Sequence, residues 1–324
     1  MTTPTSATPP GSGSPLISLL ATGGTIASRA GAIGTVPAVS GRDLAARALG
    51  APAVPLRVRE IAAKDSAAFN PGDQDGVRHA IETELADPAV GGIVVLHGTD
   101  TLEETAMLVD LGHTDLRPIV FTGAQLPDDH ADADGPGNLR LAITTAADPA
   151  ARGLGTLLAF AGSVMPVRGI IKSNTSDRSA FAGPPRPLPR IAVPPADIAS
   201  QRVDIVALYP GADPGVLDWH VAQGARAIVL QANGSGNTHP RIVDAVRRLV
   251  TAGIVVVVSS RVPFGSVTAV YGGGGGAVDL VAAGAIISSW LRPPQARIAV
   301  MALLAADAHA DDIADFFRRS IPEP

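Results

Sequence analysis

The feature of this sequence that most restricts its fold is a repeated alternation of short apolar runs with longer amphipathic runs. In its first half, the apolar runs occupy residues 16–22, 54–61, 91–98, 117–124 and 154–160, and the amphipathic runs occupy residues 41–50, 72–86, 101–112 and 137–148. The apolar runs lack the polar–apolar alternation of a strand with one face in water, so they predict parallel strands covered on both faces by helices.

The same rhythm resumes after a proline-rich segment. Strands are expected within residues 203–211, 225–234 and 253–263, and helices within 240–253, 293–306 and 310–319. We therefore predict a two-domain α/β fold, with a larger N-terminal parallel or mixed sheet flanked by helices and a smaller C-terminal α/β domain. The predicted division is a disordered tail at 1–15, an N-terminal catalytic domain at 16–183, a Pro-rich linker at 184–203 and a C-terminal domain at 204–324.

Composition excludes several classes of function. The net charge of −5 provides no basic field for a phosphate backbone, so nucleic acid is not an expected partner. No apolar stretch reaches the ~20 residues that a bilayer crossing requires, and the N-terminal residues lack the charged region of a signal peptide, so we expect a cytoplasmic protein without a membrane partner. The absence of cysteine excludes disulfides and thiolate chemistry.

Small and hydroxylated residues follow three of the predicted strands. These are Thr-Gly-Gly-Thr at 22–25, His-Gly-Thr-Asp at 97–100 and Thr-Gly-Ala-Gln at 122–125. Ligands of open α/β sheets bind at the carboxyl ends of the strands, so the first segment is a turn, a phosphate cradle or a nucleophile. After His-Gly-Thr-Asp, Thr101 and Glu104 predict a capping box at the start of the next helix. An isolated Asp100 in this position would be interpreted as a further helix cap. Backbone N–H groups of the third could hold an oxyanion.

One lysine is prominent because lysine is rare here. The chain has only Lys64 and Lys172, since almost every other basic residue is arginine. A desolvated lysine can act as a base near neutral pH and an arginine cannot. A hydroxyl nucleophile needs such a base, so we interpret Lys172, held near Thr99 and Asp100, as the base of a threonine-dependent reaction.

Other polar patches have weaker interpretations. The aspartate-rich segment 126–135 has no recognised metal-binding spacing, so we expect a solvated loop and no metal site. The glycine-rich segment 271–280 does not follow a first strand as a dinucleotide fingerprint would, and we expect a flexible loop.

Six motifs in order resemble the bacterial-type L-asparaginases of the asparaginase/glutaminase family. They are ATGGTIAS (21–28), HGTDTLEET (97–105), TGAQLP (122–127), DGPGNLRLA (134–142), NGSGN (233–237) and SSRVPFG (259–265). The resemblance runs from about Leu16 to the C-terminus and implies an asparaginase-like fold, with no metal or organic cofactor.

The resemblance also implies roles for the catalytic residues. Thr22, the first threonine of Thr-Gly-Gly-Thr, corresponds to the acylated nucleophile. Thr99, Asp100 and Lys172 correspond to the second catalytic group. The expected reaction is hydrolysis of L-asparagine to L-aspartate and ammonia, with a glutaminase-asparaginase of broader amide specificity or a non-catalytic amino-acid-binding module of the same fold as alternatives.

Substrate contacts follow from the same resemblance. Asp100, with Thr99 beside it, corresponds to the residue that binds the substrate α-amino group, Ser66 to the one that binds the α-carboxylate, and Ala124 to a strand-end position near the side-chain amide. Asn237 corresponds to a residue that reaches a neighbouring subunit's site, since family members form intimate homodimers, often paired into homotetramers. The chain departs from the family in three places. The lid segment 28–41 contains no tyrosine, and Ala67 follows Ser66 where glutamine or serine is common. The acidic residue near the C-terminus of the periplasmic subgroup has no clear match in segment 271–281, where Asp279 is the nearest carboxylate.

Overall fold

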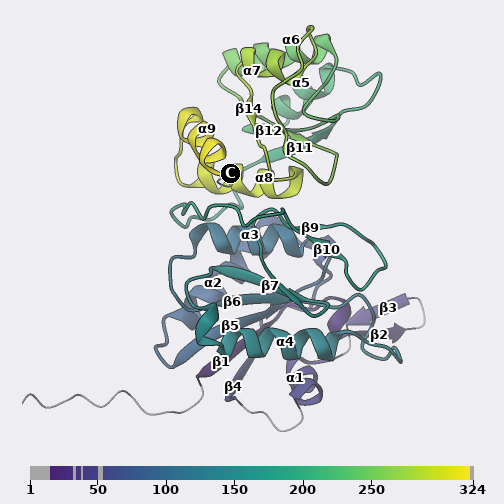
Figure 1. Cartoon of the computed structure of the whole chain (residues 1–324), viewed down its shortest axis with the longest axis vertical. Coiled ribbons are helices and arrows are strands. Elements are labelled where there is room, and N and C mark those ends of the chain that lie inside the picture. Colours follow the sequence, from purple (N-terminus) through teal and green to yellow (C-terminus); the bar gives the residue numbers. More distant parts are fainter. Residues whose placement is uncertain (1–14, 32–33, 38, 50–53, 322–324) are drawn as a thin grey trace, which may run out of the picture.

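A computed structural model describes residues 15–31, 34–37, 39–49 and 54–321, and it shows two α/β domains stacked end to end (Figure 1). The first domain contains a six-stranded sheet and the second a four-stranded sheet. The predicted two-domain fold with a mixed N-terminal sheet is confirmed. Except for Pro15, the predicted disordered tail lies outside the described residues.

The N-terminal sheet has the strand order β4-β1-β5-β6-β7-β8. All neighbours are parallel except β7 and β8, which pair antiparallel. The strands of this sheet are β1 (Leu16–Ala21), β4 (Leu56–Glu60), β5 (Val90–Leu96), β6 (Ile119–Thr122), β7 (Thr156–Phe160) and β8 (Ser163–Pro166). The helical segments of this domain are η1 (Thr25–Ala27), α1 (Gly41–Leu49), η2 (Ser66–Ala68), α2 (Pro71–Leu85), α3 (Leu102–Gly112), α4 (Gly135–Ala147) and η3 (Pro149–Ala151).

Helices cover both faces of this sheet, as the unbroken apolar runs predict. Alternate strand residues such as Leu19 and Val94 pack with α1 and α4, whereas Leu20 and Val95 pack with α2 and α3. Successive side chains of a strand point to opposite faces, so covering both faces requires an apolar residue at every position. Because β1, β5 and β6 are parallel neighbours, their carboxyl ends meet at one edge of the sheet.

The C-terminal sheet is parallel, with the order β11-β12-β13-β14. Its strands are β11 (Val203–Ala207), β12 (Ala227–Ala232), β13 (Val255–Ser260) and β14 (Ile286–Ile287). Its helices are α5 (Gly215–Ala222), α6 (Pro240–Thr251), α7 (Ala277–Ala282), α8 (Pro293–Ala305) and α9 (Ala310–Arg319).

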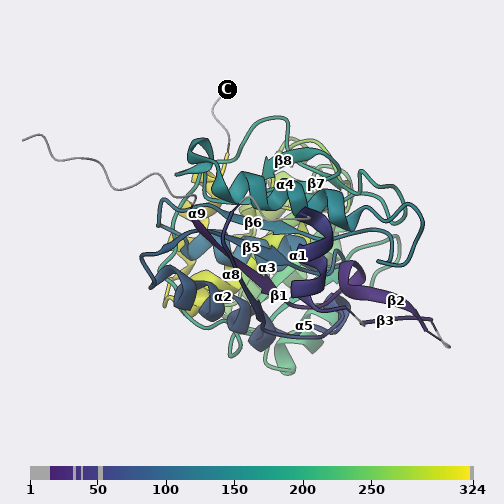
Figure 2. The same ribbon diagram turned by 90° about the horizontal axis from the view of Figure 1, so that it is seen from below.

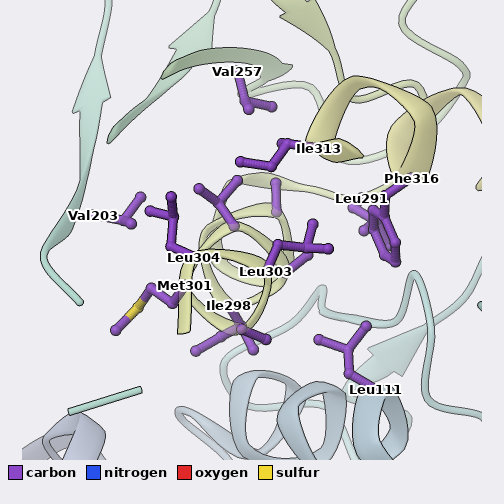
Figure 3. Packing of buried hydrophobic residues seen from close by; sticks show 14 of the residues in the cluster. Leu111, Val203, Val257, Leu291, Ile298, Met301, Leu303, Leu304, Ile313 and Phe316 are labelled. Carbon is purple, nitrogen blue, oxygen red and sulfur yellow. The ribbon is translucent and has the colours of Figure 1, made fainter. Parts of the chain in front are cut away.

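Helix α8 joins the two domains through a shared apolar core. It lies between the C-terminal sheet and α3 of the N-terminal domain (Figure 1), and its buried side chains face both, as Figure 3 shows for Ile298 near Leu111 and Leu304 near Val203. One continuous cluster of buried side chains therefore includes residues of both sheets' covering helices, which fixes how the domains sit on each other.

The Pro-rich segment 184–203 packs against this core. Leu188, Val193 and Ile198 are buried in the same cluster as α3 and α8. The buried Arg168 guanidinium donates to the carbonyls of Pro189 and Ile191, which anchors the segment from the side of the N-terminal domain. The segment is therefore an extended, packed connection.

Several elements differ from the sequence-based expectations. The lid segment contains an antiparallel hairpin of β2 (Ser28–Gly31) and β3 (Gly34–Pro37), which projects from the body of the domain (Figure 2). A second short pair, β9 (Ile171–Lys172) and β10 (Phe181–Ala182), was not expected either. The segment predicted to be a flexible glycine-rich loop ends in α7, because Asp279 accepts a hydrogen bond from Gly276 N and caps that helix.

The predicted capping box of α3 is wrong. Thr101 occupies the N-cap, but its hydroxyl makes no cap hydrogen bond and donates instead to the carbonyl of Ser66, at 2.9 Å. Among the described residues, no helix is long and apolar enough to cross a membrane.

Candidate active site

Three strand ends converge because glycines allow their backbones to touch. Gly24, which follows β1, has φ +84°, and a Cβ there would lie 2.5 Å from Gly98 Cα beyond β5. A Cβ on Gly98 would lie 2.6 Å from Ser66 Oγ, and one on Gly123 beyond β6 would lie 3.2 Å from Thr99 Cγ2. No larger residue fits these contacts without movement, so the glycines bring the hydroxylated segments to one place.

The predicted Thr99, Asp100 and Lys172 group is assembled. Lys172 Nζ, from β9, donates to Thr99 Oγ1 at 2.8 Å and to Asp100 Oδ1 at 2.7 Å. The Thr99 and Lys172 side chains are largely buried, whereas 61% of the Asp100 side chain is exposed. The group therefore presents a carboxylate to solvent and keeps an amine and a hydroxyl in contact behind it.

The Thr22 hydroxyl makes its hydrogen bond to a strand carbonyl and not to this group. Thr22 is fully buried, and its Oγ1 donates to the carbonyl of Leu96 at 2.9 Å. Its backbone extends the β1 ladder, since its N–H also donates to Leu96 O and its carbonyl accepts from Lys64 N. An attacking hydroxyl must reach the substrate, so this geometry argues against the nucleophilic role expected for Thr22.

Thr25 is the other hydroxyl of Thr-Gly-Gly-Thr, and sequence reasoning assigned it no role. It begins η1, is only partly buried, and its hydroxyl makes no hydrogen bond to any residue that the structure describes. Gly24 beside it packs on Gly98, the neighbour of Thr99. The motif itself contained this signal, because it offered two hydroxyls and the first was chosen by resemblance alone.

The segment after β6 contributes the side chain of Gln125 to the site. Thr99 Oγ1 lies 3.4 Å from Gln125 Oε1, to which it can donate. The sequence predicted that backbone N–H groups of this segment could hold an oxyanion. The N–H groups of Gln125 and Leu126 instead donate to the Asp134 carboxylate and are not available for that role. Ala124 is buried beside Gly135 and Ile26. Gln125 was missed because a polar residue in a turn carries no distinctive spacing.

Ser66 lies in the same place, and Asn237 belongs to the other domain. The buried Ser66 is held against Gly98 and accepts from Thr101 through its carbonyl. Asn237 follows β12 in the C-terminal domain and forms an isolated antiparallel bridge with Asn233. The structure thus gathers Ser66 with the Thr99 group and leaves Asn237 on a separate sheet edge.

His97 precedes the group as a neutral packing residue. Burial lowers the pKa of its imidazole to about 4, although a hydrogen bond between Nδ1 and Gly98 O opposes the shift. Its ring packs edge-on against Phe69, with centroids 4.9 Å apart. An imidazole that stays neutral at pH 7 supports Gly98 and does not supply charge.

The aspartate-rich segment makes ion pairs and turns. Asp128 pairs with Arg29 and Arg47, and Asp134 accepts from the turn after β6. In the part of the chain that the structure describes, no three His, Asp or Glu side chains gather as ligands of a metal ion would.

Comparison with known proteins supports the interpretation of the fold. The asparaginase N-terminal family model matches residues 16–200, and the glutaminase/asparaginase C-terminal domain model matches residues 202–317. The chain is 32% identical to a probable L-asparaginase of Deinococcus radiodurans, over 95% of this chain and 98% of that protein. It is 31% identical to L-asparaginase 2 of Escherichia coli, over 94% and 93% of the two chains.

A solved structure agrees with these matches. The crystal structure of a probable cytoplasmic L-asparaginase from Campylobacter jejuni superposes with a TM-score of 0.81 at 27% identity, covering 94% of this chain and 99% of that one. Two family models that span both domains, together with relatives more than 30% identical over nearly the whole chain, show that this protein belongs to the asparaginase/glutaminase family and is an amidohydrolase.

Proposed function

We propose that this enzyme hydrolyses L-asparagine to L-aspartate and ammonia through a threonine ester. The observation that carries the proposal is the contact of Lys172 Nζ with both Thr99 Oγ1 and Asp100 Oδ1 at the converging strand ends. A binding module needs the exposed carboxylate but no amine buried against a hydroxyl. The names of the relatives point to the same substrate.

The proposed reaction has two displacements. A threonine Oγ bonds to the side-chain amide carbon of asparagine, the C–N bond breaks, and the hydroxyl proton leaves with ammonia. The oxygen of a water molecule then bonds to the acyl carbon, the bond to threonine Oγ breaks, and Oγ regains a proton. Lys172 and Thr99 are proposed to move these protons, because hydroxyl nucleophiles require an adjacent base.

We propose Thr25 as the attacking residue in place of Thr22. Thr25 is only partly buried and its hydroxyl has no hydrogen-bond partner among the described residues, whereas the Thr22 hydroxyl is buried and bound to Leu96 O. Thr25→Val should abolish turnover, whereas Thr22→Val should lower stability and retain turnover. Intact-protein mass spectrometry of acid-quenched reactions should detect an aspartyl adduct in Thr22→Val and none in Thr25→Val. The reverse pattern would restore Thr22 as the nucleophile.

The substrate's charged end has two proposed partners. The exposed Asp100 carboxylate is suited to the α-ammonium group, and Ser66, held beside Gly98, to the α-carboxylate. Ala124, buried at the end of β6, would shape the space near the amide. Both charged groups of an amino acid would thus be held while its side-chain amide lies toward the threonines.

Ammonia release tests the activity directly. Purified enzyme should release ammonia from L-asparagine, and parallel assays with L-glutamine and D-asparagine define its amide specificity. Equal rates with glutamine would identify a glutaminase-asparaginase. Binding of asparagine without ammonia release from any of these amides would refute the enzymatic proposal and favour an amino-acid-binding module.

We also propose that the enzyme is a cytoplasmic homodimer or homotetramer. The loops after β13 expose Phe264, Val270 and Tyr271 in one stretch of chain, which is a surface suited to a second copy. In such an assembly Asn237 would contribute to the neighbouring site. Light scattering coupled to size exclusion should give a multiple of the 32.8 kDa chain, and a fully active monomer would refute the shared site.

A further inference from the structure

Glu103 contacts the backbone of the lysine in the Thr99 group, although its own side chain lies outside that group. It lies in the first turn of α3 and is 7% exposed. Its Oε2 accepts a hydrogen bond from Lys172 N at 2.5 Å. Lys172 lies on the two-residue strand β9, which pairs only with β10 within the described residues, so such a short strand depends on this additional contact.

Gln295 extends the same contact from the C-terminal domain. It lies on α8 and is fully buried. Its Nε2 donates to the carbonyls of Glu103 at 3.0 Å and Val167 at 2.8 Å, and its Oε1 accepts from Gly169 N at 2.6 Å. The segment 167–172 is therefore fixed at one end by Gln295 and at the other by Glu103, and these two residues are bonded to each other.

We propose that Glu103 and Gln295 are positioning residues that hold Lys172 in register with Thr99 and Asp100, so that the C-terminal domain supports the catalytic amine. The proposal rests on the hydrolytic function proposed above. Lys172 Nζ must meet Thr99 Oγ1 and Asp100 Oδ1 at the same time, which restricts where its backbone can lie. A misplacement of about 1 Å in such a group can cost on the order of 10²-fold in rate. A charged acceptor holds the Lys172 N–H more firmly than a neutral one does.

The charge of Glu103 depends on pH near neutrality. Burial and, to a smaller degree, the nearby Glu104 carboxylate raise the pKa of its carboxyl to about 7, against the opposing effects of the Lys172 N–H and the Lys172 charge. Glu104 itself pairs with Arg297 of α8 at 3.4 Å. Below about pH 7 Glu103 becomes neutral, so its hold on Lys172 should weaken as the pH falls and should be complete above pH 7.

The central test is the pH profile of kcat for asparagine hydrolysis in the wild type and in Glu103→Gln. The wild type should lose activity below about pH 7. The glutamine variant keeps an acceptor oxygen but cannot ionise, so its kcat should be lower by roughly three- to tenfold at pH 8. Its kcat should also lack the fall in activity below pH 7, which we call the acid limb of the profile. Its KM should change little, because Glu103 does not face the substrate's charged groups.

Two further variants separate positioning from general damage. Glu104→Gln removes the neighbouring like charge and should move the limb to lower pH while leaving kcat at pH 8 within about twofold. Gln295→Met removes the three hydrogen bonds of Gln295 at similar volume, and should lower kcat while keeping the limb. Circular dichroism checks that each variant is folded, and the Glu104 and Gln295 variants decide the case if Glu103→Gln does not fold.

The outcomes distinguish this proposal from the proposed function. A wild type without amidase activity refutes the function. An active wild type whose profile near pH 7 is unchanged in Glu103→Gln and in Glu104→Gln overturns the positioning role. Normal kcat in Gln295→Met overturns the contribution of the C-terminal domain.

Discussion

Replacing Asp110 by asparagine should destabilise the protein more than any surface ion-pair change, because Asp110 neutralises a buried guanidinium. The Asp110 side chain is 2% exposed and lies 2.5 Å from Arg168 Nε, whose own side chain is 4% exposed. Asp110 also pairs with Arg190 and accepts from Thr156 N. It therefore joins α3, β7 and the Pro-rich segment at a single carboxylate.

The expected magnitude follows from what remains after the substitution. Removing one partner of a buried ion pair costs about 3–5 kcal/mol, because the other charge stays buried. Asparagine can still accept from Thr156 N, and Arg168 keeps its carbonyl partners on the Pro-rich segment, so we expect the lower end, about 3 kcal/mol. This loss is a large part of a typical stability of 5–15 kcal/mol but leaves the chain folded.

Urea unfolding followed by circular dichroism measures this loss. The midpoint of Asp110→Asn should fall at an unchanged slope, which reports a change in stability at constant exposed area. The control is Asp315→Asn, whose exposed pairs with Arg318 and Arg319 should contribute below about 1 kcal/mol. Equal midpoints for the two variants would show that the buried pair does not stabilise the connection between the domains.

Two predictions concern turnover. Lys172→Arg should lose about as much kcat as Lys172→Met, roughly 10²–10⁴-fold, because a guanidinium cannot accept a proton near neutral pH. Substantial ammonia release by the arginine variant would show that Lys172 is not the base. Ala67→Ser should lower KM by about three- to tenfold with little change in kcat, because a hydroxyl beside Ser66 adds a hydrogen bond to the α-carboxylate that water replaces only in part. An unchanged or higher KM would show that the exposed Ala67 does not face the substrate.

Periodicity predicted the sheets better than the connections. The runs that became β1, β5 and β6 are apolar at nearly every position, which only a sheet covered on both faces requires, and the strand ends followed from that. The lid hairpin and β9 are too short for any period to be read from them. The Pro-rich segment was read as a linker, since proline excludes helix and central strand, but the burial of Leu188 depends on α3 and α8, which come from elsewhere in the chain.

The structure brings together the Thr99, Asp100 and Lys172 side chains that the resemblance implies as one group, and Thr99 and Asp100 lie in one short motif. Lys172 lies 72 residues from Asp100, and no local pattern joins them. The supporting residues were not predicted, since Glu103 and Gln295 look like ordinary helix residues until their burial is known. Sequence motifs therefore point to the proposed catalytic groups more readily than to the buried residues that we propose position them.

The Thr-Gly-Gly-Thr segment shows why the choice between its two hydroxyls needed a structure. Thr22 continues β1 by one residue, so its backbone and side chain both bond to Leu96 of the neighbouring strand. Gly23 and Gly24 then adopt φ values of +102° and +84°, which only glycine tolerates readily, and these turn the chain sharply before Thr25. The first threonine thus completes the ladder, and the second begins η1 after Gly24, which itself packs on Gly98. The pair of glycines therefore separates a threonine whose hydroxyl is bound to the neighbouring strand from one whose hydroxyl has no hydrogen-bond partner among the described residues.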